Sequence, residues 1–409
     1  MKISKVVLCI LAFFIIAIAA CLALFFRSSG CGSGSGFTTG EHTVASNGTE
    51  RVYYLELPKD YNSNTAYSLV FGFHGLGGDY TSFTEGSSYN LQSAMGEEAI
   101  LVYPNALPDD SDVTKWVDSD LDFFDDLYAE LEENLCFDIR KVFALGHSAG
   151  AGFTHELGCQ KGDILRGIGP VAGGLTSDYS ECIGQVAVIQ IHGGNDTVTP
   201  LGLILPTREY WIAINSCKKG ETSEGVDTSC DAYGSCDTNF TVQYCEHSGG
   251  HEWPAFASEG IWDFFSSLPE VAPSNEKGTG DVENLGKGIA NFKINYPLDF
   301  VGVPEKLALA LYPYGTSPPV YVAPSYVLNF DVPLGVINIG EITEYSNVET
   351  TMSGVVYGNY TFTVIVYVEG SGYPIPTTGV DYQGFQDITI GSDTITLDTP
   401  IELDFVDSF

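Results

Sequence analysis

The chain has 409 residues, of which 44% are hydrophobic and 12% aromatic, so it can bury a large core and is not disordered as a whole. Only 17 Lys and Arg stand against 53 Asp and Glu, which gives a formal net charge of −36. A surface this anionic repels polyphosphates and excludes nucleic acid as a partner.

The N-terminal segment predicts export. Lys2 and Lys5 precede an uninterrupted apolar run over residues 6–26. This run reaches the ~20 residues that span a bilayer and exceeds the ~7–15 of a signal-peptide core. It predicts either an uncleaved signal anchor or a lipoprotein signal with lipidation at Cys31 or Cys21. Residues 1–36 would then be a signal or anchor segment with a Gly/Ser-rich tether, and the rest would be extracellular or at the cell surface.

From residue 37 to residue 268, short apolar runs alternate with longer amphipathic ones. Runs rich in β-branched and aromatic residues predict strands at 51–57, 68–74, 99–103, 141–146, 186–192 and 240–245. Helical spacing predicts a helix over 118–135, capped by Asp118 or Ser119, and others after Gly150, near 207–216 and over 253–268. Apolar strands separated by helices indicate an α/β fold with a mostly parallel sheet.

The composition changes after residue 268. Residues 269–285 predict a linker, because their first part is rich in Pro, Gly and charged residues. Residues 286–409 predict strands at 330–339, 354–368 and 388–397 between Gly and Pro turns, which is typical of a small accessory β-sandwich. This part has no Cys, His or Trp, so we do not expect catalytic chemistry there.

The cysteines indicate disulfides. Of ten, Cys9, Cys21 and Cys31 lie in the leader, and seven lie within a short stretch: Cys136, Cys159, Cys182, Cys217, Cys230, Cys236 and Cys245. Such clustering in an exported chain favours disulfides over a metal site, and no CxxC pair is present. Because seven is odd, either one thiol is free or Cys31 pairs. The spacing does not determine the connectivity.

Residues 146–150 (GHSAG) form a GxSxG pentapeptide around Ser148. A predicted buried strand precedes it and a helix-compatible segment of small residues follows it. This is the strand–turn–helix setting of a nucleophile elbow, where glycines leave room for a tight turn. A serine hydroxyl needs a base to accept its proton and an acid to orient that base, in the chain order Ser, Asp or Glu, then His.

That order selects the partners of Ser148. His42, His74 and His147 come too early or adjoin the serine, His155 lies on the same predicted helix, and His192 precedes the acid. His251 is the preferred base, with His247 as the alternative. Asp196 follows an apolar strand, where open α/β sheets build their sites. Asp231 and Asp237 are weaker candidates for the acid.

Acyl transfer also needs two backbone N–H donors for the oxyanion. Ala149, directly after the nucleophile, is expected to supply one of them. The other is expected from residues 74–78 (HGLGG), at Leu76, because this glycine-rich loop follows a predicted strand.

The segments HGLGG, GHSAG, GGND and GGHEWP, in this order, resemble the esterase family of feruloyl esterases and polyhydroxybutyrate depolymerases, similar to carbohydrate esterase family 1. The match covers roughly residues 40–268. The resemblance implies an α/β-hydrolase fold with Ser148, Asp196 and His251 as the triad. It also suggests a substrate-binding role for Trp116, His147 and Trp253. The accessory β-domain is not part of the shared core.

These observations predict an exported, monomeric serine carboxylesterase that needs neither metal nor cofactor. The expected substrate is a feruloyl ester on plant polysaccharide. Alternative substrates are a polyester such as polyhydroxybutyrate and acetylated xylan. A peptidase shares the triad. A non-catalytic binding or adhesion protein is the alternative from another class, and the complete Ser, Asp and His set argues against it.

Overall fold

The computed structural model describes residues 26–271, except residues 35, 85–86, 88, 110, 176–181, 200 and 238, and the side chains of residues 202, 203, 205, 206, 219 and 220. Beyond residue 271 it describes only backbone strands. The described chain divides into two compact units. The first contains residues 26–192, 215–247 and 252–271, and the second contains Gly193–Ile214, Ser248–His251 and the later strands.

A ten-stranded sheet forms the centre of the first unit, in the order β1-β2-β4-β3-β5-β6-β7-β10-β9-β8. Its strands are β1 Gly40–Ser46, β2 Thr49–Glu56, β3 Tyr67–Phe73, β4 Ala99–Pro104, β5 Phe137–His147, β6 Gly167–Val171, β7 Ala187–Gly193, β8 Lys218–Glu224, β9 Cys230–Gly234 and β10 Val242–His247. The five central strands, β4, β3, β5, β6 and β7, pair in parallel. Antiparallel pairs flank them on both sides. This confirms the predicted α/β class and mostly parallel sheet.

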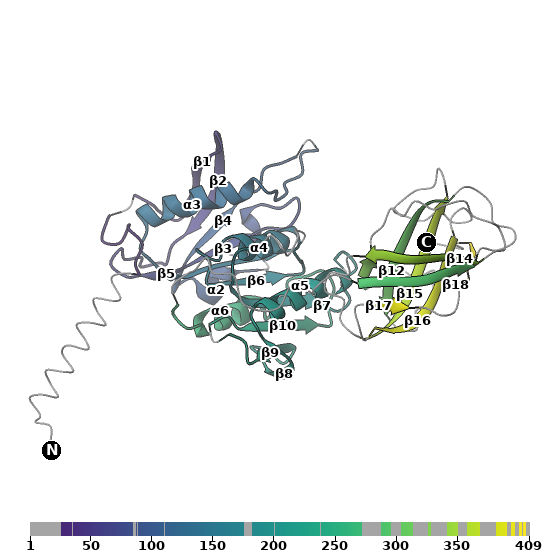
Figure 1. Ribbon diagram of the computed structural model, residues 1–409. Coiled ribbons are helices and arrows are strands. Elements are labelled where there is room, and N and C mark those ends of the chain that lie inside the picture. Colours follow the sequence, from purple (N-terminus) through teal and green to yellow (C-terminus); the bar gives the residue numbers. More distant parts are fainter. Residues whose placement is uncertain are drawn as a thin grey trace, which may run out of the picture. The chain divides into compact units, whose positions relative to one another are not determined.

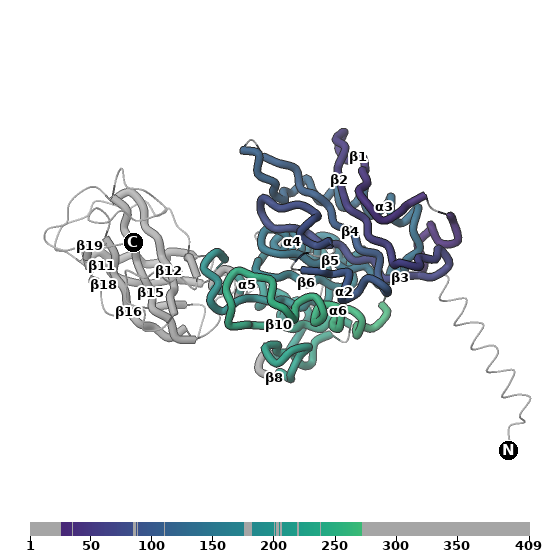
Figure 2. The backbone as a smooth tube through the Cα atoms, turned by 180° about the vertical axis from the view of Figure 1, so that it is seen from behind, coloured from purple at the N-terminus to yellow at the C-terminus, as the bar shows by residue number. Residues whose placement is uncertain are grey.

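The helices are α2 Leu91–Met95, α3 Asp120–Asn134, α4 Ala149–Gln160, α5 Leu201–Ile214 and α6 Ala257–Ser267, with a short 3-10 turn, η1, at Tyr80–Ser82. Alternate residues of β3 face opposite sides of the sheet. Val70 packs in a cluster with residues of α2 and α6, whereas the ring of Phe71 contacts Phe124 of α3. Helices therefore cover both faces, with α3 and α4 on one and α2 and α6 on the other (Figures 1 and 2).

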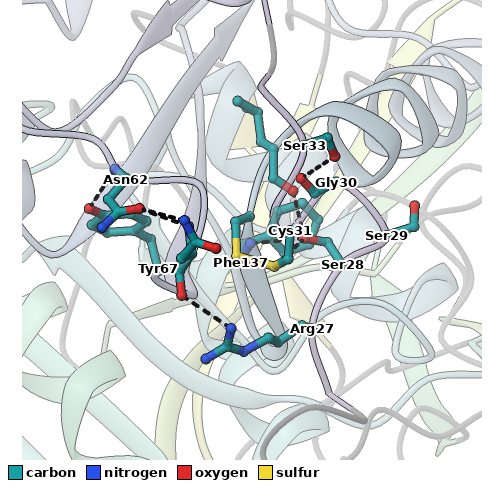
Figure 3. The surroundings of a disulfide bond; sticks show 12 residues. Arg27, Ser28, Ser29, Gly30, Cys31, Ser33, Asn62, Tyr67 and Phe137 are labelled. Atoms are coloured by element: carbon teal, nitrogen blue, oxygen red, sulfur yellow. Dashed lines mark hydrogen bonds between the residues drawn. A yellow bond between two sulfur atoms is a disulfide. The ribbon is translucent and has the colours of Figure 1, made fainter.

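The segment before β1 is docked onto the first unit (Figure 3). Arg27 forms an antiparallel bridge with Asp138, and the Ser28 amide donates to the carbonyl of Phe137 at 2.9 Å. The Ser28 hydroxyl donates to the Leu135 carbonyl at 2.6 Å and accepts from the Phe137 amide at 2.9 Å. Ser28 is only 3% exposed, because the segment lies against the first unit. Gly32 also donates to the Ser63 carbonyl, so this end of the predicted tether is held in place.

All eight cysteines of the described residues form disulfides: Cys31–Cys136, Cys159–Cys182, Cys217–Cys236 and Cys230–Cys245. The predicted disulfide framework is confirmed, and the odd count of seven is resolved because Cys31 pairs. The predicted lipidation at Cys31 is wrong, since its sulfur is bonded to Cys136. Cys21 and almost all of the apolar run 6–26 lie outside the described residues. Among the helices that are described, none has the length and apolar character needed to cross a membrane.

The described strands from residue 288 onward form two sheets. The four-stranded sheet contains β11 Gly288–Asn295, β14 Ile342–Thr350, β17 Thr394–Thr396 and β18 Ile401–Glu402, and the five-stranded sheet contains β12 Pro304–Pro313, β13 Tyr326–Leu328, β15 Gly358–Val368, β16 Tyr382–Ile390 and β19 Asp404–Phe405. Both are β-rich as expected, whereas the strand predicted at 330–339 falls outside the described residues. The β-sandwich and its boundaries remain predictions.

Candidate active site

Ser148 lies in a sharp turn between β5 and α4. Its backbone has φ 56° and ψ −119°, a conformation that residues other than glycine rarely adopt. The turn is tight because its neighbours lack Cβ atoms: a Cβ on Gly146 would lie 2.7 Å from Thr154 Oγ1, and one on Gly150 would lie 2.6 Å from the His74 carbonyl oxygen. The packing around the turn thus maintains the strained backbone of the half-buried serine.

Two backbone amides suited to an oxyanion lie on elements next to this turn. Ala149 is the first residue of α4, whose initial amides have no acceptor within the helix. Leu76 follows β3 in a loop closed by two hydrogen bonds, from the Gly77 amide to the Thr114 carbonyl at 2.8 Å and from the Gly78 amide to the Gly75 carbonyl at 3.0 Å. Within the described part of the chain, neither the Leu76 nor the Ala149 amide donates to a protein acceptor.

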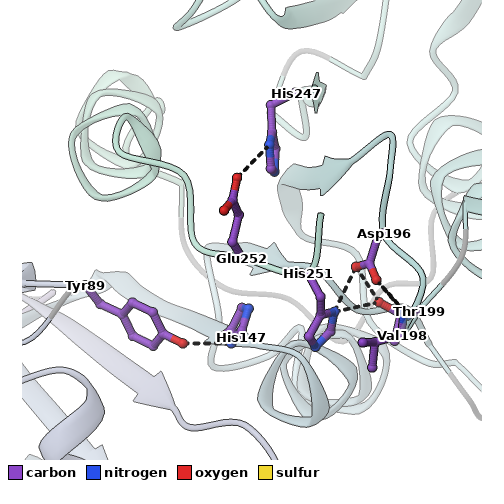
Figure 4. A network of polar contacts seen from close by, with 8 residues as sticks. All are labelled: Tyr89, His147, Asp196, Val198, Thr199, His247, His251 and Glu252. Carbon is purple, nitrogen blue, oxygen red and sulfur yellow. Dashed lines mark hydrogen bonds and ion pairs between the residues drawn. The ribbon is translucent and has the colours of Figure 1, made fainter. Parts of the chain in front are cut away.

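Asp196 and His251 are in direct contact. Asp196 lies three residues after β7, and its Oδ2 accepts a hydrogen bond from His251 Nδ1 at 2.8 Å (Figure 4). Asp196 Oδ1 accepts the amides of Val198 and Thr199 at 2.8 and 2.9 Å. The side chain of Asp196 is fully inaccessible and that of His251 is 18% exposed. With Asp196 ionised and acting only as acceptor, the shared proton resides on His251 Nδ1.

Opposing effects act on the pKa of Asp196. Burial raises it, but the Thr199 amide, His251, the Thr199 hydroxyl and the Val198 amide all donate hydrogen bonds that favour the charged form. The net result is a pKa below the ordinary value for aspartate. The carboxylate is therefore charged at neutral pH and can stabilise a positive charge on His251.

The His251 loop is fixed to the segment that carries Asp196. The Asn195 amide donates to the Gly249 carbonyl at 3.0 Å, and Asn195 Nδ2 donates to the Ser248 carbonyl at 2.8 Å. Gly193 allows this close approach, because a Cβ there would lie 2.6 Å from the Gly249 oxygen and nearer still to the Gly250 oxygen. The predicted acid and base are thus held together by main-chain contacts as well as by their own hydrogen bond.

Several known proteins that are similar to this chain are named as esterases. No family model matches it. A probable feruloyl esterase C from Aspergillus niger is 30% identical over 257 residues, which cover 58% of this chain and 91% of that protein. The chain belongs to the feruloyl esterase family. A feruloyl esterase D from Neurospora crassa is 28% identical over 266 residues, covering 58% of this chain and 90% of the relative. By this membership the protein is a carboxylic ester hydrolase.

Two solved structures are also similar to the esterase. An acetyl xylan esterase from Aspergillus awamori has a TM-score of 0.45 and 14% identity, and covers 56% of this chain and 99% of its own. A ferulic acid esterase from Anaeromyces mucronatus, in complex with ferulic acid, has a TM-score of 0.40 and 18% identity, and covers 59% of this chain and 94% of its own.

The weaker candidates have other contacts in this esterase. His247 Nδ1 lies 3.9 Å from Glu252 Oε1 (Figure 4). Asp231 is an exposed residue of β9 opposite Tyr244, and the exposed Asp237 donates its amide to the Asn215 carbonyl. Asp196, by contrast, is hydrogen-bonded to His251.

Trp116 supports the glycine loop of the esterase. Its indole N–H donates to the His74 carbonyl at 2.8 Å, and its ring stacks on Phe153 of α4 with the centroids 5.0 Å apart. His74 is itself buried and holds both sides of the turn, through Gly75 at 2.8 Å and through the Ala106 amide at 3.1 Å. Burial lowers the pKa of His74, so the ring is neutral. These contacts fix the loop that carries the Leu76 amide.

His147 and Trp253 meet around a tyrosine that the sequence analysis missed. The hydroxyl of Tyr89 lies 2.8 Å from His147 Nδ1, and its ring stacks on Trp253 at 4.6 Å (Figure 4 shows the Tyr89–His147 contact). Trp253 Nε1 donates to Ser258 Oγ at 3.0 Å. Tyr89 belongs to no motif, so its place beside the residue that precedes Ser148 could not be found from the sequence.

Proposed function

We propose that this esterase is an exported serine hydrolase that cleaves feruloyl esters of plant polysaccharides through an acyl-enzyme. The observation that carries the proposal is the strained turn at Ser148, whose positive φ accompanies a sharp change of direction between β5 and α4. Such strain persists only where the surroundings maintain it, and it is typical of a nucleophile elbow. The relatives named feruloyl esterases support the choice of substrate.

In the proposed reaction Ser148 Oγ attacks the ester carbonyl carbon while His251 accepts its proton at Nε2. Asp196 keeps the other ring proton on Nδ1 and stabilises the imidazolium. The amides of Leu76 and Ala149 stabilise the oxyanion. The alcohol leaves with the proton from His251, and water then hydrolyses the acyl-enzyme to the free acid. Ser148 follows β5, one of the parallel strands at the centre of the sheet, and open α/β sheets build their sites at the carboxyl ends of such strands.

Export is part of the same proposal. Four disulfides within residues 31–245 are typical of a protein that folds in an oxidising compartment. The charged and apolar pattern of residues 1–27 predicts the signal that directs it there.

The test compares the wild type with Ser148→Ala and, as a matched control, Ser266→Ala at an exposed position of α6. Hydrolysis of methyl ferulate should fall by about 10⁴-fold or more in Ser148→Ala and stay unchanged in the control. A fluorophosphonate probe should label all forms except Ser148→Ala. Acetylated xylan, a polyester emulsion and a peptide anilide are assayed in parallel. Faster turnover of any of these would contradict the feruloyl substrate, and labelling of Ser148→Ala would contradict the nucleophile.

A further inference from the structure

Thr199 contacts both members of the Asp196–His251 pair. Its amide donates to Asp196 Oδ1 at 2.9 Å and its hydroxyl donates to Asp196 Oδ2 at 2.9 Å. The same hydroxyl oxygen lies 3.2 Å from His251 Nδ1 (Figure 4). We propose that Thr199 is the positioning residue of this pair and that its hydroxyl sets the rate of the chemical step. The inference rests on the proposed function.

The Thr199 hydroxyl donates to Asp196 Oδ2, the same carboxylate oxygen that accepts the hydrogen bond from His251. The terminal torsion of an aspartate is broad, so the carboxylate can turn unless both oxygens are held. Amides hold Oδ1, but Oδ2 is shared between His251 and the Thr199 hydroxyl. Because the Asp196 side chain is inaccessible, water cannot readily replace a lost donor. Without the hydroxyl, Oδ2 would lose a donor that now holds it beside His251.

The hydroxyl also acts on the imidazole. Once its hydrogen points to Asp196 Oδ2, an oxygen lone pair is left to face His251 Nδ1. A hydrogen on Nδ1 then has two acceptors, the carboxylate and the threonine oxygen. This arrangement favours the tautomer in which Nε2 accepts the serine proton. Thr199 therefore orients the base without touching the substrate, and its effect should appear in kcat rather than in KM.

The test uses substitutions that differ only in the hydroxyl. Thr199→Val keeps the shape and the backbone amide but removes the hydroxyl, and Thr199→Ser restores it. Thr199→Ala provides a smaller replacement if valine prevents folding. Thr43→Val is the matched control, because it makes the same substitution at an exposed position of β1, where the Thr43 hydroxyl donates to the Glu50 carboxylate. Each is assayed for kcat and KM on methyl ferulate, with a thermal melt as a folding control.

We expect Thr199→Val to lower kcat by about ten- to a hundredfold, the range for losing a hydrogen bond to a charged group. KM should stay within about threefold of wild type, and Thr199→Ser should recover most of the rate. Wild-type kcat in Thr199→Val or Thr199→Ala would overturn the inference. Equal losses in the valine and serine forms, or a change confined to KM, would also overturn it. An inactive wild type or an active Ser148→Ala would instead refute the proposed function.

Discussion

Replacing Gly193 by alanine should misplace His251 and slow the enzyme while leaving it folded. Gly193 ends β7, where the chain passes against the carbonyls of the His251 loop. An added Cβ would lie 2.6 Å from the Gly249 oxygen, and ordinary van der Waals contact begins at 3.4 Å. The loop must therefore move by at least about 0.8 Å (3.4 − 2.6), and further to relieve the Gly250 oxygen. A misplacement of about 1 Å at catalytic groups can cost ~10²-fold in rate.

The assay is kcat/KM on methyl ferulate, with circular dichroism and thermal melts as folding controls. Gly250→Ala is the matched control: it lies in the same loop, and its added Cβ would meet nothing nearer than the Asn195 oxygen at 3.6 Å. We expect about a hundredfold loss in Gly193→Ala and no more than a few-fold change in Gly250→Ala. A folded Gly193→Ala within about threefold of wild type would refute the reasoning, as would equal damage from both substitutions.

Three further predictions concern other parts of the protein. Burial lowers the pKa of His155 to about 3, so the native ring stays neutral while the unfolded chain binds a proton below pH 6.5. The contribution of this group to the free energy of unfolding should therefore be maintained above pH 6.5 and fall by about 2 kcal/mol between pH 6.5 and pH 5. Urea melts of His155→Gln should show a shallower dependence of the free energy of unfolding on pH. A disulfide that closes a longer loop removes more conformational entropy from the unfolded chain. Replacing both Cys31 and Cys136, which are 105 residues apart, by serine should therefore lower the free energy of unfolding by about 4–5 kcal/mol, and replacing both Cys230 and Cys245, 15 apart, by about 3 kcal/mol. Chemical denaturation that ranks the two pairs the other way would contradict this argument. His247→Gln should keep kcat/KM on methyl ferulate within about threefold of wild type, because His247 lies against Glu252. A loss as severe as that of His251→Gln would leave the choice of His251 as the base unsupported.

The central sheet could be predicted because its strands are apolar on both faces. Segments such as β3 and β7 are almost wholly buried, and most of their residues are accordingly apolar. Strand β6 was missed because Gly167–Val171 contains two glycines and a proline, residues that are depleted in strands. Its glycines have a packing role: a Cβ on Gly169 would lie 2.8 Å from the Ile261 side chain. The polar strand β8 gave no apolar signal at all.

Some residues of the candidate site could likewise be predicted from the sequence, and others could not. The glycines around Ser148 and the chain order of Asp196 and His251 are local patterns, so they could be identified without a structure. Tyr89 and Thr199 depend on how separate segments meet, and neither stands in a distinctive pattern. The partner of Cys31 was likewise undetermined, because 105 residues separate it from Cys136 and spacing alone does not fix a pairing.

The docked residues before β1 determine where a recombinant form of this enzyme has to begin. A form that starts at Phe37, the first residue after the Gly/Ser-rich segment, would lack Ser28 and Cys31. The Leu135 carbonyl and the Phe137 amide would then lose their hydroxyl partner. Cys136 would become an odd thiol, able to exchange with Cys159–Cys182 or to cross-link two molecules during oxidative refolding. Producing the enzyme from residue 27 onward keeps Cys31 available to Cys136, so that all four disulfides can form within one chain.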